Sequence, residues 1–208
     1  VALIAVFPVS CAKGGGGGVV PTTSPTGTGP TAVPGTCATE NPNTNGNLVI
    51  VDIGSDILPT INPTYGSING YGVDNLDGLG GPPTYAMIIN QWSPNVQSTP
   101  TTQPITSTNI LQFTNIDGAA DNHSAVSFPQ ATFPPIPYTF PSSAASPSAN
   151  TTIGSGAWST GEISSSTLSS SGVQCFSQTF TLTAGTYYFG DFNDYNDGLV
   201  RDVLVVTP

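Results

Sequence analysis

The sequence predicts an all-β protein, and three observations lead to this fold class. No stretch keeps a helical period of 3.6 residues for long, because 24 Gly and 20 Pro residues interrupt the 208-residue chain. The apolar runs are short, and they are either continuous or alternate with period 2. Turn-forming Gly, Asn and Asp residues separate these runs. Many short strands with such turns between them are typical of a β-sandwich.

We expect seven strands after residue 36. The run at 47–53 is continuously apolar and suits a buried strand, whereas Phe176, Phe180 and Leu182 alternate with polar residues. The Ser-rich stretch 142–172 is expected to be an insertion that runs over the surface. The expected strands are residues 47–53, 86–92, 109–116, 123–129, 175–183, 186–192 and 200–206.

The composition is poor in charge. Charged residues make up 7% of the chain, the formal net charge is -10, and Lys13 and Arg201 are the only basic side chains. Binding to nucleic acid or to anionic lipid depends on clustered Lys and Arg, so we expect neither. This composition favours an extracellular or cell-surface setting.

The N-terminal part divides into an apolar run and a linker. Residues 1–10 are about half as long as a membrane-spanning helix, so we expect no membrane span. Residues 11–36 are rich in Gly, Pro and Thr and form a flexible linker to the domain at 37–208.

We expect residues 1–10 to be retained and to act as a donor strand that completes the sheet of a neighbouring copy. The protein would then be a structural filament or pilus-like subunit whose partners are copies of itself. A self-paired edge strand stays open as an alternative, since Pro8 is compatible with an edge. The apolar contact residues would be Val1, Leu3, Ile4, Val6, Phe7 and Val9.

A second interpretation concerns Cys11. The sequence PVSC at residues 8–11 resembles the end of a bacterial lipoprotein signal, although Pro8 stands where Leu is usual. The protein would then be a cell-surface lipoprotein anchored at Cys11 that carries a non-catalytic binding module for metal or carbohydrate.

The chain has three cysteines and no Cys-x-x-Cys pair, which argues against a structural zinc site. We expect Cys37, at the end of the linker, to form a disulfide with Cys175, before the last two strands. Two separate buried thiols are the alternative. Cys11 is then left over.

Two blocks resemble the cupredoxin family, the blue-copper proteins. Residues 110–128 (ILQFTNIDGAADNHSAVSF) are similar to the strand, Asn-rich turn and His of that family, and residues 180–206 are similar to its last two strands. The resemblance implies a Greek-key, cupredoxin-like β-sandwich, here preceded by an extended strand on a flexible linker.

The resemblance fails at the copper ligands. It places Asp191 at the thiolate, Asp194 at the second imidazole and Leu199 at the axial Met, and leaves His123 as the one family-like ligand. Blue copper needs a thiolate and two imidazoles. We therefore expect no cofactor and no electron transfer.

Three interpretations of the acidic loop stay open. In the first, the site is vacated and its Asp and Asn residues cap a turn. In the second, His123, Asp191 and Asp194 bind a transition metal. In the third, the loop resembles the calcium loops of propeller repeats, with oxygen donors from Asp191, Asn193, Asp197 and Asp202.

We do not expect an enzyme, and no catalytic residue is predicted. His123 is the only histidine, and no Gly-x-Ser-x-Gly motif occurs. Carboxylate pairs for glycoside hydrolysis are conceivable at Asp52 with Asp56 and at Asp74 with Asp77, but acids in such loops are usually turn formers.

Two features of the sequence concern carbohydrate: a possible binding surface and two possible glycosylation sites. Tyr65, Tyr71, Tyr85 and Trp92 could line a carbohydrate platform, but we expect core packing for most of them. Asn122 and Asn150 fit the N-glycosylation sequence.

Overall fold

The structure is a computed structural model, and it describes residues 35–42, 46–55, 57–73, 85–92, 102–118, 120–166, 169 and 172–208. Residues 1–34, which contain the predicted donor strand and most of the linker, lie outside the described residues, as do Asp56, Asp74 and Asp77. The described chain is all-β, as predicted, and its one helical element is a short 3-10 turn at Ser142–Ala145.

The larger sheet has five strands in the order β10-β12-β7-β1-β4. The paired strands at its centre are parallel and both run for six residues, with Leu48 opposite Ile110 and Ile53 opposite Asn115. All six residues of β1 are buried, which agrees with its continuous apolar sequence. The bounds are Leu48–Ile53 (β1), Tyr71–Val73 (β4), Ile110–Asn115 (β7), Thr152–Ile153 (β10) and Phe180–Leu182 (β12).

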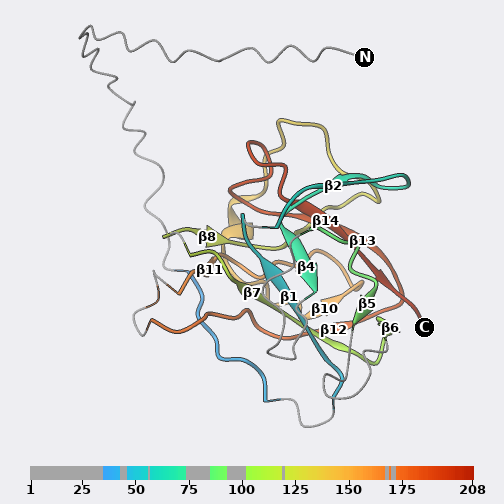
Figure 1. The fold of residues 1–208 in the computed structure, drawn as a ribbon, viewed down its shortest axis with the longest axis horizontal. Coiled ribbons are helices and arrows are strands. Elements are labelled where there is room, and N and C mark those ends of the chain that lie inside the picture. The colour runs from blue at the N-terminus through green and yellow to red at the C-terminus, as the bar shows by residue number, and fades with distance from the viewer. Residues whose placement is uncertain are drawn as a thin grey trace, which may run out of the picture. The chain divides into compact units, whose positions relative to one another are not determined.

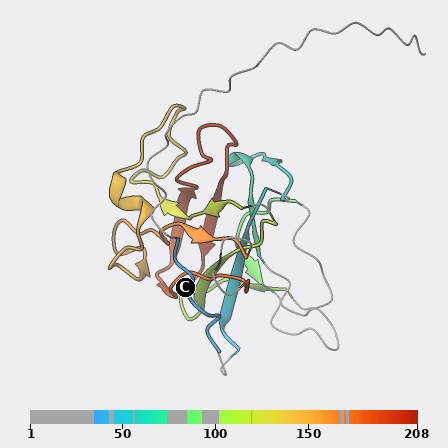
Figure 2. The same cartoon turned by 90° about the vertical axis from the view of Figure 1, so that its left-hand side faces the viewer.

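The second sheet has three strands in the order β14-β13-β9, and all its pairings are antiparallel. Its strands are Val126–Ser127 (β9), Gly185–Gly190 (β13) and Arg201–Val206 (β14). Figure 2 shows β13 and β14, in red-brown, and β1, in blue, in separate layers.

The main core lies between these two layers. Val51 and Phe113 of the larger sheet share one buried cluster with Phe189 and Leu204 of the smaller sheet. The rings of Phe113 and Phe189 meet edge to face, with centroids 5.9 Å apart. The arrangement is therefore sandwich-like.

Three short strand pairs complete the described chain (Figure 1). They are β2 (Thr60–Asn62) with β3 (Gly66–Ile68), β5 (Gln91–Trp92) with β6 (Gln103–Pro104), and β8 (Asn122–His123) with β11 (Ile163–Ser164).

The expectation that residues 142–172 run over the surface is wrong for much of this stretch. Ile153, Trp158 and Ile163 are buried in the main core cluster. Ser159 and Thr160 are also buried, and both hydroxyls donate hydrogen bonds to main-chain carbonyls. Those bonds satisfy the polar groups, so a Ser-rich segment can enter the core.

The predicted disulfide between Cys37 and Cys175 is confirmed. It joins residues 138 positions apart in sequence, and main-chain hydrogen bonds in both directions between Ala38 and Phe176 lie beside it. Among the described residues, no helix is long and apolar enough to cross a membrane.

Candidate functional site

The candidate site is a cluster of carboxylates around His123. This residue ends the two-residue strand β8, opposite Ile163 of β11, and only 3% of it is exposed. The turn that follows β13 brings Asp191 and Asp194 to the same place. Segments about 70 residues apart in sequence therefore meet at one imidazole ring.

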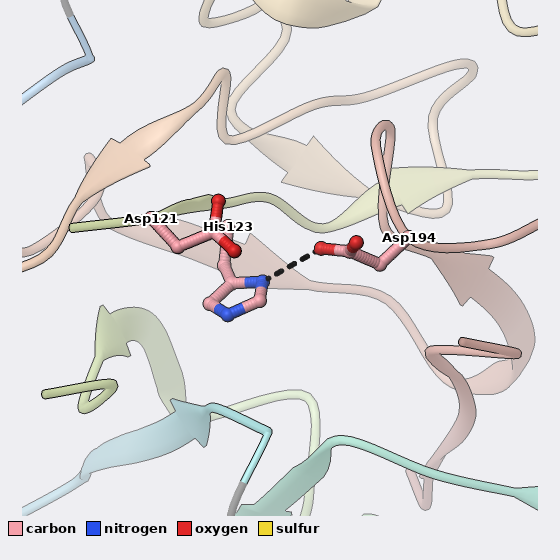
Figure 3. Close-up of side chains that lie close together, drawn as sticks. All are labelled: Asp121, His123 and Asp194. Atoms are coloured by element: carbon pink, nitrogen blue, oxygen red, sulfur yellow. Dashed lines mark ion pairs between the residues drawn. The ribbon is translucent and has the colours of Figure 1, made fainter. Parts of the chain in front are cut away.

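Both nitrogens of that ring face carboxylates. Nδ1 lies 3.4 Å from an oxygen of Asp191 and 3.3 Å from an oxygen of Asp194. Nε2 lies 3.3 Å from an oxygen of Asp117. Figure 3 shows the carboxylate of Asp194 directed at the ring nitrogen.

Asp191 also holds the loop together. One of its oxygens accepts the amide N–H of Ser124 at 2.6 Å, and the other accepts those of Asn193 at 2.8 Å and Asp194 at 3.0 Å. The hydroxyl of Ser124 in turn accepts the N–H of Phe192 at 2.8 Å. The predicted capping of the turn by an aspartate is thus confirmed at Asp191.

Two further acids join the cluster to the rest of the domain. An oxygen of Asp117 accepts the hydroxyl hydrogen of Ser55 at 2.6 Å, which links the cluster to the loop after β1. Glu162, which is buried, accepts a hydrogen bond from the Asn193 side chain at 3.0 Å.

The carboxylates determine the charge of His123. Burial alone would lower the pKa of the imidazole, because it disfavours the charged form. The close contacts with Asp191, Asp194 and Asp117, together with the charge of Asp191, outweigh burial and raise the pKa of His123 to about 11. At neutral pH His123 is therefore an imidazolium, and its positive charge offsets part of the surrounding negative charge.

The cluster also contains a set of ligand atoms of the right kind for a cation. One oxygen each from Asp121 and Asp194 and one His123 nitrogen all lie within 4.8 Å of one another. Such a set suits a hard or borderline divalent cation better than copper of the blue type, because it contains no sulfur. A cation at Nδ1 would have to displace the proton from His123.

The hydroxyl group next to His123 in sequence is not an accessible nucleophile. Ser124, next to His123 in sequence, is fully buried and its hydroxyl is engaged with Phe192.

The structure does not bring the four proposed calcium ligands together. Asp191 and Asn193 are neighbours in the turn, but Asp202 lies in β14, and its carboxylate accepts the N–H of Val203 at 2.6 Å. Asp197 is exposed. No hydrogen bond among the described residues joins Asp197 or Asp202 to Asp191.

The other predicted site residues are placed as follows. Tyr71 and Trp92 belong to the main core, which is the role expected for most of these aromatic residues, so neither is available for a carbohydrate platform. Tyr65 is half-buried and Tyr85 is exposed. Asp52 is buried in β1, and Asp56 lies outside the described residues.

Both glycosylation candidates lie in half-buried positions. The side-chain nitrogen of Asn150 donates to the carbonyl of Ala157 at 3.0 Å. Asn122 precedes His123 in β8.

Sequence reasoning missed three acids of the cluster, Asp117, Asp121 and Glu162. A signal was present for the first two, since both stand within six residues of His123 in the segment that resembles cupredoxins. Glu162 comes from the Ser-rich stretch and carried no such signal.

Comparison with family models, with curated proteins and with solved structures found no match to this chain.

Proposed function

We propose that this chain is a non-catalytic, extracellular structural protein that assembles into filaments. Its β domain is a cupredoxin-like, Greek-key sandwich in which protein side chains have replaced the copper, and residues 1–10 of one subunit complete the sheet of the next. The observation that carries the proposal is the buried His123 cluster, in which an internal cation stands in for a metal ion.

The position of the cluster supports the cupredoxin-like part. His123, Asp191 and Asp194 come together at one point, which is where the resemblance would put three ligands. The last two strands also pair with each other as antiparallel neighbours. Because Asp191 is committed to three main-chain N–H groups, its role is structural.

The filament part rests on the tail. An apolar, uncharged run followed by a linker of about 25 residues can reach a neighbouring subunit, because such a linker spans roughly 25–30 Å on average. The disulfide, the low charge and the Thr/Pro-rich linker support an extracellular setting.

The test is a deletion. The full chain and a chain without residues 1–10 are purified and imaged by negative-stain electron microscopy. We expect filaments from the full chain only, while circular dichroism shows the same folded β domain in both. A matched control deletes ten linker residues, 19–28, and should keep its filaments. Filaments that persist without residues 1–10 would contradict the proposal.

A second candidate function is a cation-binding module on a cell-surface lipoprotein anchored at Cys11. It is favoured by the proximity of the ligand atoms of Asp121, His123 and Asp194. Calorimetric titration with Zn²⁺, Mn²⁺ and Ca²⁺ tests the binding, with Asp194→Asn as the damaged site and Asp197→Asn as the control. Mass spectrometry of the mature N-terminus tests the anchor, because a lipid on Cys11 excludes a retained Val1.

A further inference from the structure

In the part of the chain that the structure describes, the smaller sheet has an incomplete edge beside Thr186. Strand β9 pairs with β13 only at Phe189 and Gly190, and the last hydrogen bond of this ladder runs from the N–H of Phe128 to the carbonyl of Tyr188 at 2.9 Å. Residues 129–132 then form bends. The N-terminal half of β13 is therefore not paired with β9.

The main chain of Thr186 points toward the missing strand. In an antiparallel ladder, the N–H and C=O groups of alternate residues face the same neighbour. The Tyr188 carbonyl faces β9, so the N–H and C=O of Thr186, two residues earlier, face the same side. The next residue of the β9 segment in register would be Gln130. The chain bends at Pro129, before Gln130 can pair.

A groove of about 440 Å³ lies at this edge. Its lining is rich in aromatic and small residues and contains no charged side chain. The residues are Ser127, Phe128, Pro129, Gln130, Ala131, Gly154, Gly156, Ala157, Trp158, Thr186, Tyr187 and Tyr188.

The aromatic lining is held in place. The hydroxyl of Tyr187 donates to the carbonyl of Thr183 at 2.8 Å. Gly154 leaves room for that hydroxyl, because it has a φ of 107° and a Cβ there would lie 2.4 Å from the Tyr187 oxygen. Tyr188 packs edge to face on Phe133, with centroids 5.1 Å apart.

We infer that this groove is the acceptor site for residues 1–10 of a second copy of the chain. The inference rests on the proposed function and names the surface that it requires. An extended peptide can pair its main chain with Thr186 and place alternate side chains on the two faces of β13, next to Tyr187 and Tyr188. The fit is chemical as well: the side chains of residues 1–10 are uncharged and mostly apolar, and so is the lining.

Photochemical cross-linking of the full chain tests the inference. Phe7 is replaced by p-benzoylphenylalanine, and ¹⁵N-labelled and unlabelled proteins are mixed, assembled and irradiated. We expect cross-links between a labelled and an unlabelled copy, at residues 127–131, 154–158 or 186–188. Cross-links within one copy, or only at other surfaces, would overturn it.

A pair of variants tests the hydrogen bond. Thr186→Pro removes the N–H that faces the groove and spares those that pair with β14, while Thr186→Val keeps it. We expect the proline variant to raise the critical concentration for assembly about tenfold and the valine variant to change it less than about twofold. Equal effects would contradict the role of Thr186, provided that circular dichroism shows both variants folded.

The filament proposal and the acceptor-site inference can be contradicted independently of each other. Filaments without cross-links in the groove would overturn the acceptor site and leave the filament proposal standing. Cross-linked pairs without filaments would support the acceptor site and contradict the filament.

Discussion

Replacing His123 with Gln would remove the positive charge from the centre of the carboxylate cluster. Glutamine can still donate hydrogen bonds through its amide NH2, but it is uncharged, so the buried Asp191 and Asp117 would then have no cation between them. Breaking a buried ion pair by removing one partner costs about 3–5 kcal/mol. We expect a loss of that size in the free energy of unfolding at pH 7.

The pH dependence of the free energy of unfolding gives a second expected magnitude. The pKa of His123 is about 11 in the folded protein and about 6.5 in an unfolded chain. Because the folded pKa is the higher one, the stabilisation is complete below about pH 6.5 and is lost as pH rises toward 11. In that interval the free energy of unfolding falls by about 1.4 kcal/mol per pH unit. From pH 7 to pH 9 the loss is thus about 2–3 kcal/mol.

The assay is urea unfolding of the full chain at pH 7, 8 and 9, followed by tryptophan fluorescence. Cys11→Ser is used throughout, so that a free thiol cannot attack the disulfide at alkaline pH. The wild-type side chain should give a stability that falls with pH, and His123→Gln a lower and flatter one.

The control is Asp197→Asn, which changes an exposed acid of the same loop and should shift stability by no more than about 0.5 kcal/mol. The reasoning would be refuted if His123→Gln matched this control at pH 7. It would also be refuted if the two slopes with pH were equal.

Three further predictions concern the core and the disulfide. Joint replacement of Cys37 and Cys175 by Ala should cost about 5 kcal/mol in the loop-entropy model, measured by urea unfolding against Cys11→Ser. Trp158→Ala should cost about 3–5 kcal/mol, and a loss below 1 kcal/mol would mean that the Ser-rich stretch is not part of the core. Burial raises the pKa of Asp202 well above its ordinary value, so its contribution to stability is lost as pH rises above about 4. Asp202→Asn should therefore gain stability relative to the parent chain between pH 4 and pH 8, and an unchanged difference would contradict this.

Much of the sheet framework could be predicted from sequence. The runs at 47–53 and 109–116 became the paired central strands β1 and β7, and those at 186–192 and 200–206 became β13 and β14. These strands are apolar over most of their length, so their pattern reports burial directly.

Other strands carried a misleading local signal. Strand β4, at Tyr71–Val73, lies outside the seven expected strands, because Asn69 and Gly70 precede it and Gly72 stands between its two apolar residues. Strands β10 and β11 were hidden in the Ser-rich stretch. Hydroxyl groups there bond to nearby carbonyls, so polar residues occupy positions that a sequence pattern assigns to the surface.

The candidate site was predicted in part. The family spacing brought His123, Asp191 and Asp194 together, and the structure does the same. The family spacing could not predict that Asp117 would contact Nε2 of the His123 ring. That contact depends on how Ser55 and the loop after β1 are placed.

The disulfide between Cys37 and Cys175 has a mechanical consequence. A pulling force that enters through the linker and leaves at the C-terminus passes across this covalent bond, so the residues between the two cysteines are shielded from extension. Only residues 176–208 can be drawn out, which releases roughly 110–120 Å of chain. The domain would thus yield a short, fixed length under load, while β1 and β7, which lie between the two cysteines, would not be extended.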